Sequence, residues 1–298
     1  MTSETVIAVM GPTGSGKSNV SCRSFASGMP RDDAANDLMS CTKDLEEFRV
    51  STSSGTYVFV DTPGFDDTCR SDREILEMIA HWLEEKYRGN IKLSGLIYTH
   101  CIMETRMSSS ICKNLDMFGR LCGDKAAQRV RLVTTMWDSM TPTDRNNAGG
   151  KASQLEQKFW KPLIKSGARH RRFNNTQQSA WEIINDVTGD SVVLLLQEEL
   201  VDAKRKLNET TAGRALYSQQ ERLLQKQKVT IKQLSDEAKV QQDPALAREL
   251  EAEYKNTEAQ LQKTWEEMEK LKVPFMRRIM LVFSKKPRTH AIQMNLQT

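Results

Sequence analysis

The sequence predicts an α/β domain, with a mostly parallel β-sheet and helices on both of its faces, followed by an α-helical, coiled-coil-like extension. Three observations lead to this expectation. A glycine-rich loop follows the first apolar run, strand-like and helix-like segments alternate up to about residue 190, and leucine stripes at helical spacing follow. Such alternation is typical of parallel sheets, because each parallel strand needs a crossover connection. We therefore expect three parts, at residues 1–190, 191–272 and 273–298.

Length, charge and cysteine usage narrow the class of protein. The chain has 298 residues, enough for one domain of about 200 residues and an appendage. The formal net charge is +4, but residues 274–298 hold five basic residues and no acidic one, so the rest is nearly neutral. We therefore expect no nucleic-acid partner for the main domain. Six scattered cysteines, no signal peptide and no apolar run of about 18 residues lead us to expect a cytoplasmic protein.

The glycine-rich loop at residues 11–18 matches the pattern G-x-x-x-x-G-K-[ST] of the phosphate-binding P-loop. It has the required context, because an apolar run precedes it and a predicted helix starts at Ser18. Its glycines let backbone N–H groups approach a phosphate, and the helix N-terminus adds partial positive charge. Lys17 should reach the β- and γ-phosphates, and the Ser18 hydroxyl should ligate Mg²⁺. The expected phosphate-binding residues are Gly11, Pro12, Thr13, Gly14, Ser15, Gly16, Lys17, Ser18 and the following Asn19.

The remaining segments up to residue 190 complete the predicted sheet. We expect strands at 5–10, 48–52, 56–60, 93–99, 129–136 and 169–173, and further helices at 73–88, 108–122, 152–164 and 180–187. The second and third strands should form a hairpin. A ligand of such a sheet is expected at the carboxyl ends of its strands.

Two further motifs follow predicted strands. Asp61-Thr62-Pro63-Gly64 is an Asp-x-x-Gly sequence, in which Asp61 would hold a Mg²⁺-bound water and the Gly64 N–H would meet a γ-phosphate. The later run Thr134-Thr135-Met136-Trp137-Asp138 places a carboxylate where a guanine reader has one, accepting from N1–H and the exocyclic amine. Met136 stands where the usual [Asn/Thr]-Lys-x-Asp sequence has lysine, and its thioether can lie over a base without adding charge.

Together these residues resemble a known family. Gly11 to Ser18, Ser40-Cys41-Thr42-Lys43, residues 61–68 and Phe173-Asn174-Asn175 resemble the immunity-associated AIG/GIMAP-type GTPases, relatives of the septins and the chloroplast-import Toc GTPases in the TRAFAC class. The Thr-Thr-Met-Trp-Asp sequence resembles that of fungal G-domain proteins. The resemblance covers about residues 3–190. It implies a P-loop NTPase G domain that binds GTP or GDP with Mg²⁺ and forms a homodimer or oligomer through this domain.

The resemblance also assigns roles residue by residue. Thr42 would be the switch threonine that closes on Mg²⁺ and the γ-phosphate, beside the Mg²⁺ ligands Ser18 and Asp61. Arg106 would stabilise transition-state charge across a G-domain dimer, the alternative being an ordinary surface arginine. The catalytic residues would thus be Lys17, Thr42 and Arg106.

Two segments are candidates for the residue that completes the guanine pocket. The resemblance favours Asn174 or Asn175, after the last strand. The rival is Ser179-Ala180, which resembles a guanine-binding motif of small GTPases. However, Ser179 and Glu182 also have the spacing of a capping box for the next helix, and for that reason we prefer the asparagines.

The expected activity is weak. Phe65 follows Gly64 at the position where many small GTPases have a water-orienting glutamine, so intrinsic hydrolysis should be slow or depend on a partner. The leading hypothesis is a GTPase whose nucleotide state controls assembly. One alternative is a nucleotide-binding scaffold without turnover. Another is an ATP-using P-loop protein, against which Asp138 and Thr42 argue.

The sequence pattern of the C-terminal third predicts two long helices and a short one. Apolar residues three or four apart from Val193 to Leu207, and again from Leu246 to Leu271, indicate helices that fold back as a hairpin or pair with a helical partner through 191–272. A helical arm lying on the G domain is the alternative. Residues 274–288 mix apolar and basic side chains, which is typical of a helix on a membrane surface and so of a peripheral membrane protein. A short docked helix or a disordered basic tail is the alternative there.

Overall fold

The computed structural model describes residues 4–23, 44–53, 55–65, 70–240 and 244–294. These residues fall into two compact units. The first runs up to Arg205 and takes in the segment from Lys285, and the second is Lys206–Ser284. The first unit is therefore longer than the expected 1–190, and the expected part 273–298 is divided between the two units.

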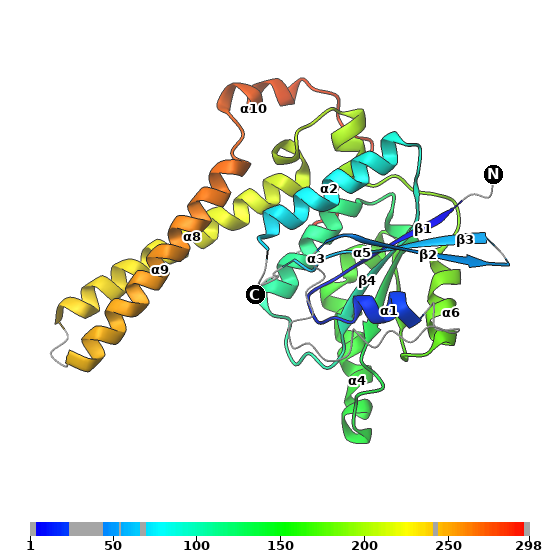
Figure 1. Cartoon of the computed structure of the whole chain (residues 1–298), viewed down its shortest axis with the longest axis horizontal. Helices are drawn as coiled ribbons and strands as arrows, with labels where there is room; N and C mark the ends of the chain where they lie inside the picture. Colours follow the sequence, from blue (N-terminus) through cyan, green and yellow to red (C-terminus); the bar gives the residue numbers. More distant parts are fainter. Residues whose placement is uncertain (1–3, 24–43, 54, 66–69, 241–243, 295–298) are drawn as a thin grey trace. The chain divides into compact units, whose positions relative to one another are not determined.

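The first unit is built on a six-stranded sheet with strand order β2-β3-β1-β4-β5-β6 (Figure 1). The strands are β1 (Thr5–Met10), β2 (Glu46–Thr52), β3 (Gly55–Asp61), β4 (Leu93–Cys101), β5 (Val130–Thr135) and β6 (Arg169–Arg172). β2 pairs antiparallel with β3, as the expected hairpin, and all the other pairings are parallel. The predicted fold class is confirmed.

Helices cover both faces of this sheet. Those of the main body are α1 (Lys17–Arg23), α2 (Asp72–Arg88), α3 (Ser109–Cys122), α4 (Pro142–Gln154), α5 (Lys161–Lys165) and α6 (Gln177–Val187). Ile97 of β4 lies in one buried cluster with Val20 of α1 and Ile184 of α6. The next residue, Tyr98, points to the opposite face, where its ring lies 4.8 Å from that of Phe118 of α3.

The pairing register brings the motif-bearing strand ends to one edge. Val9 of β1 pairs with Asp61 of β3, and Met10 pairs with Tyr98 of β4. Cys101 at the end of β4 pairs with Thr135 at the end of β5. The P-loop, the Asp-x-x-Gly motif and the Asp138 turn therefore all leave the sheet at its carboxyl edge, where a ligand is expected.

Two helix boundaries differ from the sequence expectation. The helix expected at 152–164 is instead α4, a π-helical turn (Leu155–Phe159) and α5. It begins ten residues earlier, because Thr141 caps it and Pro142 occupies its first turn. The expected Ser179–Glu182 capping box is also wrong, since Thr176 is the N-cap of α6 and Ser179 is its N3 residue.

The segment after α6 belongs to the first unit instead of the helical extension. It forms α7 (Leu195–Gln197) and a π-helical turn (Glu198–Asp202), and its leucines are buried. The buried Gln197 amide donates to the Leu83 carbonyl of α2 at 3.1 Å. The leucine spacing from Val193 onward reflects burial within this unit, not a long helix.

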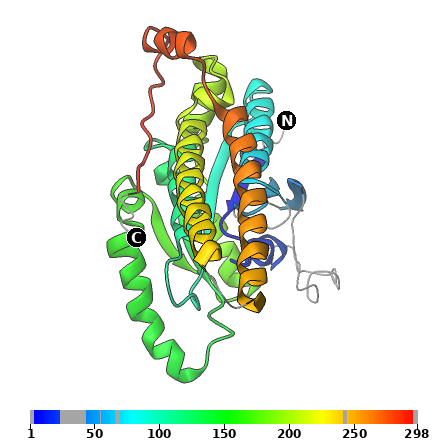
Figure 2. The same ribbon diagram turned by 90° about the vertical axis from the view of Figure 1, so that its left-hand side faces the viewer.

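The second unit is helical, as predicted. It contains a 3₁₀ turn (Leu207–Glu209), α8 (Thr211–Val240), α9 (Pro244–Leu271) and α10 (Phe275–Val282). Helices α8 and α9 lie side by side (Figures 1 and 2). Their buried side chains include Leu216, Leu224, Leu234, Thr264, Met268 and Leu271. None of the helices described is both long and apolar enough to cross a membrane.

The chain beyond α10 returns to the first unit. Glu198 accepts hydrogen bonds from the backbone N–H groups of Arg288 and Thr289, at 2.8 and 2.9 Å. Asp116 accepts from Met294 N–H at 3.1 Å, and Met294 is buried. The alternative of a disordered basic tail is therefore wrong for residues 288–294.

Candidate functional site

The backbone of the P-loop makes two contacts with neighbouring segments that are close enough to require glycine. Gly11 has a φ of +150°, and a Cβ there would lie 2.5 Å from the Thr99 carbonyl oxygen. A Cβ on Gly64 would lie 2.6 Å from the backbone nitrogen of Thr13. Both distances are too short for any side chain. The Asp-x-x-Gly motif is thus packed directly against the P-loop, as a shared phosphate site requires.

Hydrogen bonds tie the loop to the two strands beside it. Ser15 Oγ and Thr99 Oγ1 of β4 are 2.6 Å apart. Thr135 Oγ1 of β5 donates to the Ser15 carbonyl at 2.7 Å. Lys17 Nζ reaches back across the loop and donates to the carbonyls of Gly11 and Pro12, at 3.1 and 3.0 Å. The Lys17 ammonium is therefore bound to carbonyls of its own loop, at the place where a polyphosphate would compete for it.

Ser18 and Asp61 form the candidate metal site. Ser18 Oγ donates to Asp61 Oδ2 at 2.6 Å. Asp61 is only 2% exposed, and its second oxygen, Oδ1, has no hydrogen-bond partner among the residues that the structure describes. Burial raises the pKa of Asp61, although the Ser18 hydroxyl and the Lys17 ammonium oppose this. A hydroxyl and an unsatisfied buried carboxylate oxygen are the hard ligands that Mg²⁺ prefers, so these residues fit that ion.

The candidate base site joins the turns after β5 and β6. Asp138 is exposed, and its Oδ2 accepts a hydrogen bond from Asn175 Nδ2 at 2.7 Å. Asn174 instead donates its backbone N–H to Ser179 Oγ at 3.2 Å. Met136 and Asn175 have φ angles of 64° and 56°, which turn the chain sharply at both places. Of the two expected asparagines, the structure brings Asn175 to Asp138.

A partly buried network that sequence reasoning missed supports this turn. The Trp137 indole N–H donates to Thr134 Oγ1 at 2.9 Å. The same oxygen lies 2.9 Å from His170 Nε2, and His170 Nδ1 lies 2.6 Å from Glu156 Oε1. Burial lowers the pKa of His170, and Glu156 offsets part of this shift. The network links the π-helical turn, β6 and β5 to the residue before Asp138.

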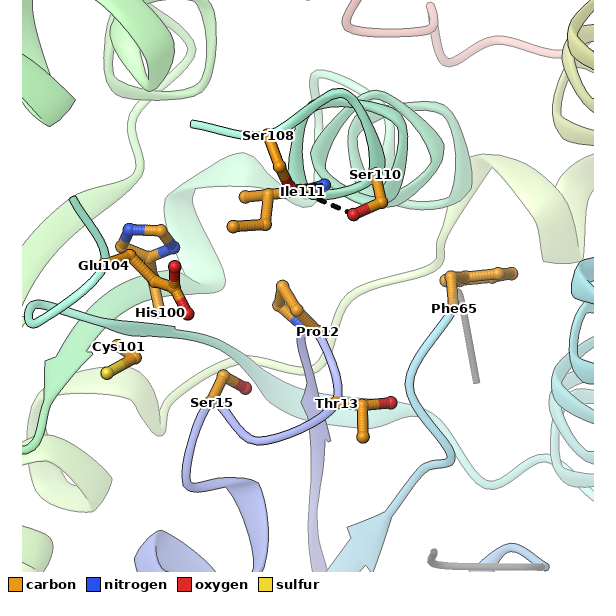
Figure 3. Close-up of a pocket in the computed structure, with 10 residues that line it drawn as sticks. All are labelled: Pro12, Thr13, Ser15, Phe65, His100, Cys101, Glu104, Ser108, Ser110 and Ile111. Atoms are coloured by element: carbon orange, nitrogen blue, oxygen red, sulfur yellow. Dashed lines mark hydrogen bonds between the residues drawn. The ribbon is translucent and has the colours of Figure 1, made fainter. Parts of the chain in front are cut away.

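A cavity of about 190 Å³ lies beside the P-loop (Figure 3). It was not expected from the sequence, whose motifs do not include the end of β4. Figure 3 shows Pro12 and the Glu104 and His100 side chains around the same space. Burial lowers the pKa of His100 to about 4, so its ring is neutral at pH 7. The lining residues are Pro12, Thr13, Ser15, Phe65, His100, Cys101, Glu104, Ser108, Ser110 and Ile111.

Arg106 and Asn19 are not among the residues that line this cavity. Arg106 lines a neighbouring cavity of about 320 Å³, which shares His100 and Glu104 with the first. Asn19 is exposed on α1. Thr42 and the rest of the Ser40–Lys43 motif lie outside the described residues.

A family model matches the part of the chain that carries the P-loop. Residues 6–114 match a family model described as 50S ribosome-binding GTPase. Together with the P-loop and the Ser18–Asp61 pair, this match supports a P-loop GTPase domain. No curated protein matches the chain.

Several solved structures are similar to part of the chain. Toc33 from Arabidopsis thaliana in complex with Mg²⁺ and GMPPNP is 16% identical, with 59% of this chain and 72% of that chain covered and a TM-score of 0.43. A structure of the chloroplast translocon components atToc33 and psToc159 is 15% identical, with 62% and 82% covered and a TM-score of 0.44. A bacterial selenocysteine-specific elongation factor is 13% identical, with 62% and 28% covered and a TM-score of 0.41.

Proposed function

We propose that this chain binds GTP and GDP with Mg²⁺, hydrolyses GTP slowly, and uses the bound nucleotide to control its own assembly. The Ser18–Asp61 pair carries this proposal. It combines a 2.6 Å hydroxyl–carboxylate contact with a buried Asp61 oxygen that lacks a partner among the described residues. A buried, unsatisfied carboxylate is costly unless a cation or a bound water completes it.

The reaction would be attack of water on the γ-phosphorus, in line with the β–γ bridging oxygen. The bond to that oxygen breaks, and GDP and phosphate leave. Lys17 would exchange the Gly11 and Pro12 carbonyls for phosphate oxygens and neutralise charge on them. Mg²⁺, held by Ser18 and a water on Asp61, would supply further charge neutralisation. The Gly64 N–H would meet the γ-phosphate, and Thr42 would complete the metal shell.

Selection of guanine would depend on Asp138. Its carboxylate can accept two hydrogen bonds from N1–H and the exocyclic amine of guanine, which adenine does not offer together. Asn175 donates to one oxygen of this carboxylate and so fixes its orientation. Because Met136 replaces the usual lysine, the affinity for the base should be lower than that of a site with the full motif.

Faster turnover would depend on a second copy of the chain. Phe65 is 8% exposed and has no polar atom with which to orient water, so the position after Gly64 does not supply that group. For the chloroplast translocon components atToc33 and psToc159, dimerisation is described as important for GTPase activity. We extend this relation to the present chain and assign Arg106 the role of contacting the partner's nucleotide. The apolar side chain at Phe65 also favours a second candidate function, a nucleotide-dependent scaffold without turnover.

The second unit would carry a partner-binding surface for a helical protein. Leu223, Val229, Leu246 and Trp265 are exposed on α8 and α9, where a third helix has apolar contacts available.

Competition and single-turnover measurements test the proposal. Unlabelled GDP should displace labelled GTP, whereas ATP at the same concentration should not. Displacement by ATP as effective as by GDP would assign the chain to ATP-using proteins. Phosphate release in a single turnover that rises with protein concentration supports the GTPase. Tight GTP binding with no release at any concentration supports the scaffold.

A further inference from the structure

Helix α10 exposes its apolar side chains to an unusual degree. No residue of the helix is buried, and Phe275 and Phe283 are 74% and 86% exposed. In contrast, the exposed apolar residues of α8 and α9 are spread over two long helices. The exposed apolar residues in and next to α10 are Phe275, Met276, Ile279, Met280, Val282 and Phe283. Single exposed apolar residues need no explanation, but six within nine residues do.

These six side chains lie on one side of the helix. At 3.6 residues per turn they cover an arc of about 160°, with Arg277, Arg278 and Leu281 on the remaining side. Arg277 Nε donates to Glu209 Oε1 at 2.5 Å, and Arg278 Nε donates to the Val273 carbonyl at 3.0 Å. The polar side is therefore fastened to the second unit and the apolar side faces away from these contacts. This is the reverse of an ordinary surface helix, which buries its apolar side.

The helix is not the frayed end of the chain. Leu271 and Val273 before it are buried, and Thr289, Ile292 and Met294 after it are buried as well. Figure 1 shows α10 as a separate short helix after α9. The chain thus presents α10 between two packed segments, and termini without such contacts are where disorder is usual.

The charge around the apolar arc is positive. Residues 274–298 contain Arg277, Arg278, Lys285, Lys286 and Arg288, and no acidic residue. Lys285 and Lys286 are exposed and follow Phe283 almost directly. An eight-residue helix is about 12 Å long, too short to cross a hydrocarbon layer of about 30 Å but suited to lie along its surface.

We propose that α10 docks on the surface of an anionic lipid bilayer, with its apolar arc among the upper acyl chains and the flanking lysines on the headgroups. The charge decides between this occupant and an apolar protein groove. A groove or a second copy needs only the apolar arc, whereas a bilayer with anionic headgroups also uses the surrounding cations. The proposal stands on residues outside the nucleotide site and does not depend on the function proposed for that site.

Vesicle co-sedimentation of the full-length chain tests the proposal. The protein should pellet with vesicles of phosphatidylcholine mixed with phosphatidylserine, and much less with phosphatidylcholine alone. Lys285→Glu with Lys286→Glu should weaken this binding at least about tenfold, since each surface cation contributes to attraction. Phe275→Ser with Phe283→Ser should weaken it to a similar extent. High salt should weaken the binding of the wild type.

Matched variants outside α10 serve as controls. Lys226→Glu with Lys228→Glu changes the same charge on α8, and Ile91→Ser with Met103→Ser removes two exposed apolar side chains of the first unit, so both should bind like the wild type. Thermal unfolding checks that each variant is folded. If the phenylalanine variant is not folded, the result for the lysine variant alone decides on the proposal. No pelleting of the wild type, or equal pelleting of all variants, would overturn the proposal. Loss of self-association in size-exclusion chromatography on changing Phe275 and Phe283, without lipid binding by the wild type, would assign the arc to a second copy.

Discussion

Asn175 Nδ2 donates a 2.7 Å hydrogen bond to Asp138 Oδ2, although the two residues are 37 positions apart in the chain. The bond joins the turn after β5 to the turn after β6, and no residue that the structure describes donates a hydrogen bond to the other Asp138 oxygen. In the proposed function, this contact sets the orientation of the carboxylate that reads guanine. It therefore makes base selectivity depend on a residue that need not touch the base.

The first prediction concerns this contact. Asn175→Ala should weaken GDP binding by about 1 kcal/mol, or roughly fivefold, because one hydrogen bond to a charged group is lost at a partly exposed site. Inosine diphosphate lacks the exocyclic amine and should bind with less change. Titration of both nucleotides measures this difference. Asn174→Ala is the matched control and should bind GDP like the wild type, and equal weakening by both variants would contradict the assignment.

The second prediction is that replacing Asp61 has opposite effects on thermal stability and on nucleotide binding. Its pKa is raised by burial, so the protonated carboxyl favours folding at acidic pH, and this contribution is lost as pH rises through the raised pKa. Asp61→Asn should therefore raise the thermal midpoint of the nucleotide-free protein at pH 7. The same change should weaken Mg²⁺-dependent nucleotide binding at least tenfold. A variant that loses stability without nucleotide, or keeps Mg²⁺-dependent affinity, would contradict the assigned metal role.

The third prediction is a pH dependence at His170. Burial lowers the pKa of this residue below the ordinary value, so the unfolded chain takes up protons that the folded chain does not. Its contribution to stability is present above about pH 6.5 and is lost as pH falls through the lowered pKa. His100, whose pKa is lowered to about 4, adds to the same trend. Thermal midpoints should fall between pH 7 and pH 5, and His170→Gln should reduce this fall.

His81→Gln is the control for that experiment, because His81 is exposed on α2. His170→Gln should also weaken GDP binding, since the Thr134–Trp137 contact before Asp138 loses its support. A GDP affinity equal to that of the wild type would show that the network stabilises the fold without positioning the base site.

The fourth prediction concerns Arg106. The hydrolysis rate per molecule should rise with protein concentration in the wild type, because the partner's Arg106 would complete the site. Arg106→Ala should remove this dependence and lower the rate at high concentration by at least about tenfold. Arg88→Ala, an exposed arginine on α2, is the matched control. Concentration-dependent turnover that persists in Arg106→Ala would reject the role.

Local signals in the sequence were sufficient for most of the first unit. The apolar run before Gly11, the hairpin of β2 and β3 and the periodicity of α2, α3 and α6 each lie within one segment, so these elements were predicted, with the start of α6 three residues late. The start of α4 was missed, because Gly149 and Gly150 weaken the helix signal and only the Thr141 cap and Pro142 reveal it. The apolar residues from Val193 to Leu207 have helical spacing, but that spacing does not indicate which unit contains each of them.

Some residues of the candidate site could be predicted from the sequence and others could not. Asp61 and Asp138 could be placed because each follows an apolar strand within a short motif. The Thr134–His170–Glu156 network could not be predicted, because its members are 36 and 14 residues apart. Thr134 and His170 meet through the parallel register of β5 and β6, and Glu156 reaches His170 from the π-helical turn. The cavity containing His100 and Glu104 likewise depends on how the end of β4 faces the P-loop.

Calorimetric titration of the purified chain with GDP and GTP, in the presence of Mg²⁺, tests the central claim most directly. The account predicts saturable heat with both nucleotides, and at least a tenfold weaker affinity in Lys17→Ala, because this ammonium neutralises phosphate charge. Absence of heat with both guanine nucleotides in a folded preparation would contradict it.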